Sequence, residues 1–464
     1  MGFLDVNSSL TGRCWTGPDA STERLTEAMI QQTGHPRAVC GLLVSRGISA
    51  EGSAKFLNPQ LRVLLPDPRG LKDMQPAASR FLQALKSRER IAIFADYDVD
   101  GGSSAALLIW WLRQMGHTAT LYVPDRLTEG YGPNPKAMTE LAAAHSLIVC
   151  VDCVTVNHDA IAAVNGTDVI VLDHHLGGET LPPALAVVNP NRQDESGDLG
   201  HLCAAGVVFL MLVELARQQR EAGSKGPDLI SMLDLVALAT VADVAPLIGI
   251  NRALVRQGLK VMARRDRPGW VALADIAKMD SAPNTHHLGF AMAPRINAGG
   301  RIGKSDLGAR LLACADPAEA QSIAEHLDGL NSERREIEQH VQNAALQQVE
   351  NRADNTPLVW AAGHGWHPGV VGIVAARIKE MTNRPTVIIG IENGEGKGSG
   401  RSVSGIDLGA AVQCLASEGL LSKGGGHNMA SGLSLTEATI EPAMARLSEL
   451  LEKQGAGRQG PKDL

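Results

Sequence analysis

Three aspartates at alternate positions follow a short apolar run. Residues 91–95 are wholly apolar and predict a strand buried on both faces; Asp96, Asp98 and Asp100 come directly after it, and a Gly-Gly pair then predicts a turn. Carboxylates crowded beside a core repel one another and lose hydration, so they need a cation to offset both effects. Mg²⁺ and Mn²⁺ prefer oxygen ligands of this kind. An acidic turn without metal explains this stretch equally well when it is taken alone.

Two further apolar runs also end in acidic residues. Asp152 follows one of them, and Asp173 follows the other and precedes His174 and His175. In a parallel sheet, ligands bind beyond the carboxyl ends of the strands, where these side chains would meet. Because side chains alternate along a strand, two adjacent histidines face one site only if the backbone turns there. We therefore expect one histidine to bind metal and the other to meet an anionic substrate.

A fourth candidate lies in a helix predicted over residues 227–243, which carries Asp234 and ends at Asp243. A carboxylate in so apolar a helix is not expected to be free, and either acid can also cap or pair locally. A set of carboxylates with one or two imidazoles favours Mn²⁺ or Mg²⁺ over zinc, which more often takes thiolates or several imidazoles. Two such ions suit in-line attack on phosphorus, so the residues indicate metal-dependent hydrolysis of a phosphoester or phosphoanhydride.

The elements that must position these residues alternate between strands and helices. Apolar runs separated by helical patterns lie at residues 91–95, 118–123, 147–151, 169–172 and 185–188. This alternation predicts an α/β fold with a mainly parallel sheet and helices on both faces.

Shifts in pattern predict the domain organisation. Residues 318–351 are rich in Ala, Glu, Gln and Leu, which indicates one or two long helices that bridge two domains. Strand and helix patterns then restart, and we expect glycine-rich turns at 394–400 and 424–426. The expected parts are a helical N-terminal extension at 1–75, a catalytic domain at 76–250, a helical connector at 251–352, a second, smaller α/β domain at 353–455 and a disordered tail at 456–464.

Composition bounds the class of protein. The chain has 464 residues, 44% of them hydrophobic, which is enough for two or three globular domains. Its net charge of −7 excludes a uniformly basic nucleic-acid binder and restricts any polyanion site to a local patch. Seven dispersed cysteines predict reduced thiols and a cytoplasmic location. The N-terminus lacks a signal-peptide pattern, no apolar run is long enough to span a membrane, and we expect a monomer.

Together, the acidic segments resemble the four motifs of the DHH phosphoesterase superfamily. These motifs are Asp96-Tyr-Asp-Val-Asp-Gly101, Asp152-Cys, Asp173-His-His175 and Thr240-Val-Ala-Asp243. Other segments are similar to the RecJ family of single-stranded-DNA-specific exonucleases and its DHHA1 domain. They are Arg46-Gly47, Phe56-Leu-Asn-Pro59, Asn189-Pro-Asn191, Ala293-Pro-Arg-Ile-Asn297, Gly300-Arg301, Asn331-Ser-Glu-Arg-Arg335, Trp366-His-Pro-Gly-Val-Val-Gly-Ile-Val374, Gly398-Ser-Gly-Arg401 and Gly424-Gly-Gly-His427. One such motif is a weak signal, whereas this ordered set is highly specific.

The resemblance implies a Mn²⁺- or Mg²⁺-dependent exonuclease with two ions, which digests single-stranded DNA from 5′ to 3′ into mononucleotides in DNA repair and recombination. The implied metal ligands are Asp96, Asp98, Asp100, Asp152, His174 and Asp243, with Asp152 bridging the ions. Asp98, His174 and His175 would be catalytic, and His175 would face the scissile phosphate and stabilise its developing charge. Asp243 is preferred to Asp234 because it aligns better with the acid that ends the fourth motif.

The resemblance also implies contacts to the DNA strand. The expected contacts are the side chains of Arg295, Arg301, Arg401 and His427 and the amides of Gly425 and Gly426. Those after residue 400 would form an anion-binding nest in glycine-rich turns. Phosphate contacts of this kind predict salt-sensitive, sequence-independent binding. A solvated surface charge is the alternative for each basic residue, and the scarce aromatics, 3% of the chain, give little sign of a base-stacking platform.

The chain departs from the family pattern at three points, one of which is Gly299, where alanine is common. The second motif usually reads Asp-Cys-Gly, but Val154 replaces the glycine; if the backbone there has positive φ, valine is costly and activity is affected. Longer members carry a further OB-fold that helps to hold single strands. A chain without it is either a piece of such a protein or a compact relative with a weaker grip on DNA and shorter substrates.

Two other functions remain open at this point. One is a phosphodiesterase for short oligonucleotides or cyclic dinucleotides, and the other is a non-catalytic DNA-binding scaffold descended from a nuclease. The retained acids argue against a scaffold, which has no need of unpaired carboxylates. The expected partners are single-stranded DNA and a single-strand-binding protein or a helicase, with no membrane.

Overall fold

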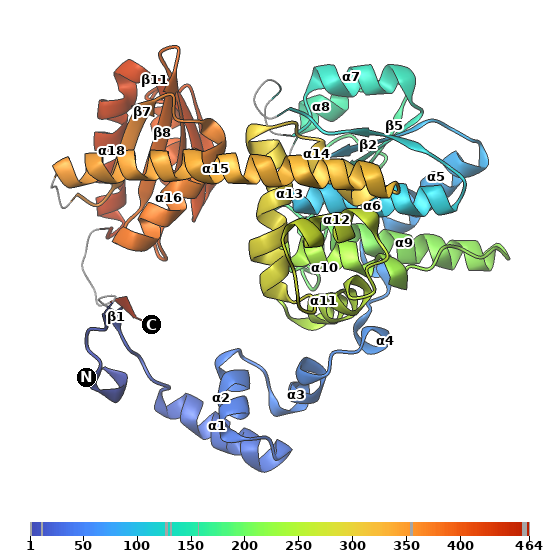
Figure 1. Cartoon of the computed structure of the whole chain (residues 1–464), viewed down its shortest axis with the longest axis horizontal. Helices are drawn as coiled ribbons and strands as arrows, with labels where there is room; N and C mark the ends of the chain where they lie inside the picture. Colours follow the sequence, from blue (N-terminus) through green and yellow to red (C-terminus); the bar gives the residue numbers. More distant parts are fainter. Residues whose placement is uncertain are drawn as a thin grey trace. The chain divides into compact units, whose positions relative to one another are not determined.

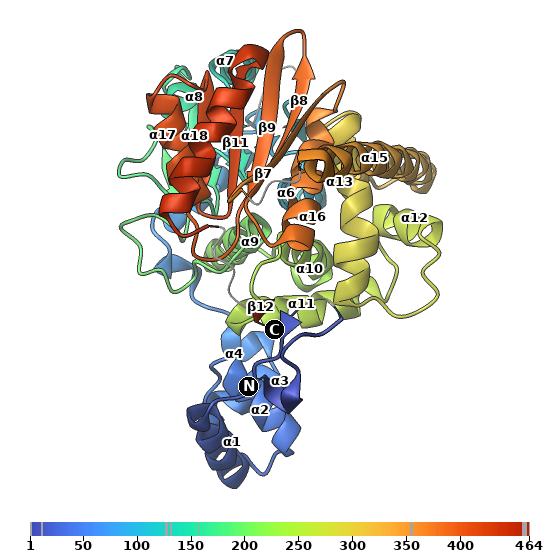
Figure 2. The ribbon, with the colours of Figure 1, turned by 90° about the vertical axis from the view of Figure 1, so that its left-hand side faces the viewer.

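The computed structural model describes residues 2–10, 13–125, 129, 132–155, 157–352, 356–456 and 462–463 (Figures 1 and 2). The chain forms two compact units. Residues 24–331 form the parallel-sheet unit, and residues 1–23 together with 332–464 form the mixed-sheet unit. Most of the tail expected to be disordered, 457–461 and 464, lies outside the described residues.

The parallel-sheet unit is built on a sheet of five strands. In spatial order these are β3 (Ala119–Tyr122), β2 (Ile91–Ala95), β4 (Leu147–Val151), β5 (Asp168–Leu172) and β6 (Ala186–Val188). All neighbours are parallel, which confirms the predicted fold class. The register pairs Ala95 with Val151 and Val151 with Leu172. The residues that follow these three positions therefore leave the sheet side by side at its carboxyl edge.

Helices cover both faces of this sheet. One face packs against α5 (Met74–Lys86), α6 (Val99–Gln114), α9 (Ala204–Glu221) and α10 (Leu233–Ala242), and the other against α7 (Pro135–Ala144) and α8 (His158–Ala162). The remaining helices of the unit are α1 (Ala20–Thr33), whose first residues belong to the mixed-sheet unit, α2 (Arg37–Ser45), α3 (Ala50–Leu57), α4 (Leu61–Leu64), α11 (Gly249–Met262), α12 (Pro268–Ile276), the π-helix η4 (His287–Met292), α13 (Ala293–Ile302) and α14 (Leu307–Ala313).

The predicted connector at 251–352 does not form a separate body. Its residues Leu254, Leu273, Ile296 and Leu327 are buried in the same core as strands β2 and β4. The long helix α15 (Pro317–Arg352) is the predicted helix, and the boundary between the two units falls within it.

The turn expected at the Gly-Gly pair is wrong, because this pair lies in the first turn of α6. Asp98 is the N-cap, and its Oδ1 accepts hydrogen bonds from the amides of Asp100 and Gly101 at 2.9 and 3.1 Å. A Cβ at Gly101 would lie 2.5 Å from the carbonyl oxygen of Asp96. Glycine is required here for close packing of the helix start on the strand end.

The mixed-sheet unit has five strands in the order β10 (Lys423–His427), β11 (Ala430–Thr436), β9 (Glu395–Arg401), β8 (Thr386–Glu392) and β7 (Val359–His364). Only β7 and β8 are parallel to each other. Helix α16 (Pro368–Thr382) and the last turns of α15 pack on one face, and α17 (Leu408–Ser417) and α18 (Ile440–Lys453) pack on the other. In the same unit β1 (Arg13–Cys14) pairs with β12 (Lys462–Asp463).

The glycine-rich turns expected at 394–400 and 424–426 are largely wrong, since these glycines lie mainly in strands β9 and β10. A Cβ at Gly398 would lie 2.7 Å from Leu433 Cδ1, and one at Gly424 would lie 2.8 Å from Leu421 Cδ1. The glycines make room for apolar side chains of neighbouring elements, which a pattern of turn residues cannot reveal. Across the described residues, we find no helix with the length and apolar character needed to cross a membrane.

Candidate metal centre

Three aspartates leave the parallel sheet at adjacent points of its carboxyl edge. Asp96, Asp152 and Asp173 follow β2, β4 and β5, and each is no more than 4% exposed. The register of the strands brings them together, as the sequence predicts. Carboxylates buried this deeply require partners, and the partners differ from one aspartate to the next.

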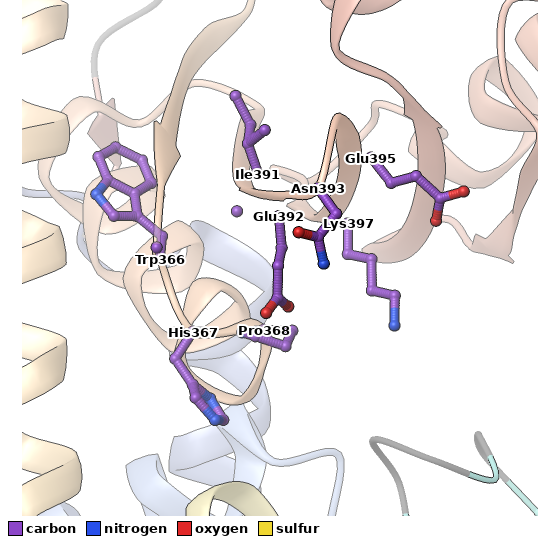
Figure 3. Close-up of a pocket in the computed structure, with 10 residues that line it drawn as sticks. Trp366, His367, Pro368, Ile391, Glu392, Asn393, Glu395 and Lys397 are labelled. Carbon is purple, nitrogen blue, oxygen red and sulfur yellow. The ribbon is translucent and has the colours of Figure 1, made fainter.

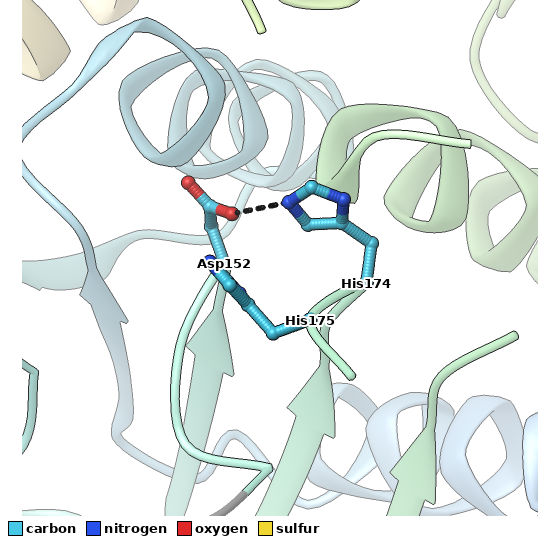
Figure 4. Close-up of side chains that lie close together, drawn as sticks. All are labelled: Asp152, His174 and His175. Carbon is cyan, nitrogen blue, oxygen red and sulfur yellow. Dashed lines mark ion pairs between the residues drawn. The ribbon is translucent and has the colours of Figure 1, made fainter. Parts of the chain in front are cut away.

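His174 stands at the centre of the group. Its Nε2 lies 3.2 Å from Asp152 Oδ1 and 3.7 Å from Asp100 Oδ2, and its Nδ1 lies 3.9 Å from Asp243 Oδ2. Figure 4 shows His174 and His175 reaching Asp152 from the end of the neighbouring strand. The first imidazole therefore connects the carboxylates of β4, α6 and the end of α10.

The side chains form three overlapping groups that could each hold a metal ion. They are Asp96, Asp98 and Asp152; Asp152, His174 and His175; and Asp100, His174 and Asp243. Within each group the potential ligand atoms lie within 4.8 Å of one another. Asp152 and His174 each belong to two groups. The six residues predicted as metal ligands thus meet in one place, and the sharing of Asp152 is the arrangement that a bridging ligand needs.

The electrostatics of these carboxylates fit divalent cations. Burial, followed by the charges of Asp100, Asp98 and Asp96, raises the pKa of Asp152 well above its usual range. Burial, followed by the charges of Asp100 and Asp98, raises the pKa of Asp243 to about 8. Asp152 Oδ1 is buried and makes no hydrogen bond, its approach to His174 notwithstanding. Buried carboxylates that have raised pKa values and an oxygen without a hydrogen bond lower the stability of the fold. The same features suit them to binding Mn²⁺ or Mg²⁺.

Asp173 differs from its neighbours because the protein satisfies its oxygens. It accepts hydrogen bonds from the amide and hydroxyl of Thr155 at 3.1 and 2.5 Å, from the His174 amide at 2.7 Å and from His175 Nδ1 at 2.8 Å. Burial opposes its ionisation, but the bonds from His175 and Thr155 outweigh burial and hold the pKa of Asp173 below its usual range. The bond to Asp173 raises the pKa of His175 to about 9 against the effect of burial.

Two asparagines fix the backbone that carries both histidines. Asn189 Nδ2 donates to the His175 carbonyl at 2.8 Å and to Thr155 Oγ1 at 2.9 Å, and Asn191 Nδ2 donates to the His174 carbonyl at 2.5 Å. Sequence reasoning found these asparagines only as part of a family resemblance. Their role was missed because they follow a different strand, β6, and only the register brings them here.

The structure gives Asp234 and Asp243, the two alternatives for the fourth acid, different surroundings. Asp234 is buried and accepts two hydrogen bonds from Arg267, at 2.6 and 2.9 Å. Asp243, at the end of α10, faces His174. These positions are consistent with Asp243 as the predicted metal ligand, because the charge of Asp234 is already paired with Arg267.

The backbone after β4 is strained. Asp152 has φ 61° and Val154, which is buried, has φ 96°. A β-branched residue rarely adopts this region, and such strain amounts to about 1–3 kcal/mol. The positive φ that would make valine costly at this position is therefore present.

The residues expected to bind DNA fall into both units. In the parallel-sheet unit, Arg295 donates to Asp328 Oδ1 at 2.8 Å, and Arg301 is half-buried near the end of α13. In the mixed-sheet unit, Arg401 ends β9 and donates to Ser399 Oγ at 2.9 Å. Their contacts with DNA stay predictions.

The glycine amides predicted to form an anion-binding nest lie in a strand instead of a turn. Gly425 and Gly426 lie in the edge strand β10, where they pair with Gly432 and Ser431, and His427 ends this strand. A strand alternates the direction of its amides, so the two glycines do not direct both amides to one anion as a turn would.

The mixed-sheet unit also contains a cavity of about 460 Å³. Figure 3 shows that Trp366, His367 and Pro368 line one side of it, and that Glu392, Asn393, Glu395 and Lys397 line the other. Among the described residues, none of the three-residue metal-ligand groups lies in this unit.

Comparisons with known proteins agree with this division. Residues 90–240 match the model of the DHH family N-terminal domain, and residues 355–453 match the DHHA1 domain. The chain is 43% identical to the single-stranded-DNA-specific exonuclease RecJ of Dickeya dadantii (strain 3937), over 90% of this chain and 75% of the relative. It is 39% identical to RecJ of Escherichia coli (strain K12), over 88% of this chain and 74% of the relative.

Solved structures give the same result. RecJ from Thermus thermophilus in complex with Mn²⁺ matches 97% of this chain and 64% of its own length, with a TM-score of 0.79 and 32% identity. Exonuclease RecJ bound to manganese matches 84% of this chain and 96% of its own length, with a TM-score of 0.71 and 36% identity. A Mg²⁺ complex of the Thermus protein matches with a TM-score of 0.71. With its aspartates and histidines gathered at one sheet edge and a DHHA1 domain after them, the chain belongs to the RecJ family of single-stranded-DNA-specific exonucleases.

Proposed function

We propose that this protein is a divalent-metal-dependent exonuclease that hydrolyses single-stranded DNA from 5′ to 3′ and releases mononucleotides. The observation that carries the proposal is the sharing of Asp152 and His174 between three groups of potential ligands at one sheet edge. The Oδ1 of Asp152 supports it, because a buried carboxylate oxygen that accepts no hydrogen bond lowers stability unless an ion binds there.

We assign the binding of two divalent ions to Asp96, Asp98, Asp100, Asp152, His174 and Asp243. When bound, such ions activate water as a nucleophile and neutralise charge on the phosphate. The protein orients the ligands in advance. The amides of Ala204 and Ala205 donate to Asp100 at 2.7 and 2.8 Å, and the start of α6 fixes Asp98. Held in this way, the carboxylates need little rearrangement when the ions bind.

His175 is assigned to the scissile phosphate. Its Nδ1 faces Asp173, and its side chain is 45% exposed, so the ring is held on one side and reaches solvent on the other. Its raised pKa favours the imidazolium near neutral pH, and a cation at this position stabilises charge that develops on the phosphate oxygens. Asn189 and Thr155 support the arrangement by fixing the His175 carbonyl and the Asp173 carboxylate.

The proposal extends to the setting of the reaction. The family relation supports DNA repair and recombination as the process, and a single-strand-binding protein or a helicase as partners. The seven free cysteines support a cytoplasmic protein, and we propose a monomer. Arg295, Arg301, Arg401 and His427 are the side chains that we assign to the DNA backbone.

A nuclease assay with two differently labelled ends tests the proposal. With Mn²⁺, a 5′-labelled single strand should release its label at once as a mononucleotide, whereas a 3′-labelled strand should shorten progressively. A chelator should abolish both reactions, and duplex DNA should be resistant. Loss of the 3′ label first, or no release with Mn²⁺ present, would contradict the proposal. Faster cleavage of dinucleotides than of long strands would instead favour a phosphodiesterase for short substrates.

A further inference from the structure

An exposed phenylalanine lies on the π-helix η4. The side chain of Phe290 is 75% exposed, although the chain has only six phenylalanines. Among the described residues of the parallel-sheet unit, it is the one phenylalanine or tryptophan exposed to this degree. Its ring stacks on His286, with ring centroids 4.9 Å apart and an angle of 26° between the planes. A large aromatic ring that is exposed to solvent and stacked on a second ring indicates a contact surface.

The π-helix has a local cause. Pro294 lacks an N–H, so it cannot donate to the carbonyl of Phe290 four residues earlier, and its ring would clash with that carbonyl in an α-helix. A wider turn over His287–Met292 relieves this clash. The guanidinium Nη1 of Arg295 donates to the Ala291 carbonyl at 2.7 Å. π-helical turns occur frequently at functional sites, and this one determines where Phe290 points.

The π-helix η4 contacts helix α10 close to Asp243. A Cβ at Gly289, the residue before Phe290, would lie 3.6 Å from Val241 Cγ1 on α10. Val241 is two residues before Asp243, whose Oδ2 lies 3.9 Å from His174 Nδ1. The π-helix therefore packs on the same helix end that carries a proposed metal ligand.

The residue after Asp243 is also unusual. Val244 is 85% exposed and has φ 58°, at a position after a helix where glycine is usual. An exposed β-branched residue in this region gains nothing from burial and is strained. Val244, which directly follows Asp243, and Phe290, on a π-helix that contacts α10, are thus both exposed apolar side chains.

We propose that Phe290, backed by His286, stacks on a base of the DNA strand beside the metal centre. The proposal rests on the proposed nuclease function and assigns it a base-binding subsite. Stacking on an aromatic ring tolerates every base, which suits an enzyme that degrades any sequence. Loss of one such contact weakens binding by about 5- to 150-fold.

The test compares Phe290→Ala, Phe290→Leu and Phe290→Trp on a single strand with Mn²⁺. We expect KM to rise about 10-fold or more for Phe290→Ala, to rise in part for Phe290→Leu, and to stay near the wild-type value for Phe290→Trp. The melting temperature should not change, since Phe290 is exposed. Leu42→Ala is a matched control because it removes an apolar side chain of similar exposure (63%) from the surface of α2, and it should leave KM unchanged.

A series of strands with one abasic residue at successive positions from the 5′ end locates the contact. For the wild type, one position should raise KM, and for Phe290→Ala that position should cause no further rise. Equal KM values for wild type and Phe290→Ala would overturn the subsite, as would an additive effect of the abasic residue in the variant. A wild type that fails to cleave any strand would refute the nuclease function itself, so the two failures are distinguishable.

Discussion

The two sheets use their loops and polar residues in opposite ways. At the carboxyl edge of the parallel sheet, buried carboxylates repel one another and Asp152 Oδ1 accepts no hydrogen bond. In the mixed sheet, Gly398, Gly400 and Gly424 occupy strand positions where a Cβ would clash, and Arg401 bonds to its own strand. The first arrangement reduces stability to prepare a site, whereas the second builds a tightly packed scaffold.

The difference explains which parts of the protein carry chemistry. A repulsive cluster persists only where the surrounding structure fixes it, and here the strand register and the capping of α6 do so. The mixed-sheet unit offers a charged strand end and an edge strand of glycines, which suit contact with a long polymer. We therefore expect variants of the carboxylate cluster to change kcat, and variants of the residues assigned to DNA contacts to change KM.

The largest effect is expected from Asp152→Asn. This change should lower kcat on a Mn²⁺-supported strand by about a thousandfold or more, equivalent to ~4 kcal/mol, because two groups of ligands lose their shared member. Measured in chelator at pH 7, the same variant should be more stable to urea than the wild type by about 1 kcal/mol or more.

The stability gain has a definite pH dependence. The folded-state pKa of Asp152 is raised, so above the unfolded-state value near 4 the carboxyl destabilises the fold, and Asn removes this penalty. Below pH 4 the carboxyl is protonated in both states and the gain should vanish. A variant that loses activity and also stability at pH 7 would show that Asp152 is structural.

A smaller effect is expected from Asp173→Asn. The carboxylate that holds His175 is lost, and we expect kcat to fall about 10- to 100-fold, as is usual for a residue that orients an active-site imidazole. Mn²⁺ affinity, measured by calorimetry, should change little because Asp173 belongs to none of the three ligand groups. Thr155→Val is a matched control that removes one bond to Asp173 and keeps the carboxylate. A large loss of Mn²⁺ binding in Asp173→Asn would instead indicate that Asp173 is a metal ligand.

Arg401→Ala tests the second unit. Loss of a phosphate contact should raise KM about 3- to 10-fold, leave kcat nearly unchanged and reduce the slope of log KM against log salt by about 1. Arg446→Ala, which breaks an exposed pair with Glu418 in the same unit, serves as the control and should leave KM unchanged. A fall in kcat without a rise in KM for Arg401→Ala would contradict the assignment of Arg401 to DNA binding.

The smallest effect concerns the strained turn. Because Val154 has φ 96°, Val154→Gly should be more stable than Val154→Ala by about 1 kcal/mol in urea unfolding, which reverses the usual order of alanine over glycine. At Val149, in the middle of β4, the usual order should hold. Equal or lower stability of the glycine variant at 154 would remove the argument for strain.

The sequence predicted the features that follow from repeated local patterns. Apolar runs ending in acids located β2, β4 and β5 and their carboxylates, and parallel strands then require these to meet. The sequence did not predict the roles of Asn189, Asn191 and Thr155, because these roles depend on the register of β4, β5 and β6. The glycines at 394–400 and 424–426 were misassigned because close packing and turns both demand glycine. Phe290 was overlooked because a low aromatic count says nothing about exposure.

Anomalous diffraction at the manganese edge, from crystals grown with Mn²⁺, tests the central claim most directly. Two peaks are expected at the carboxyl edge of the parallel sheet, with Asp152 bound to both ions and His174 to one. In crystals of Asp152→Asn at least one peak should be lost. Manganese bound elsewhere, or a pair of ions that does not involve Asp152, would contradict a two-ion site bridged by Asp152.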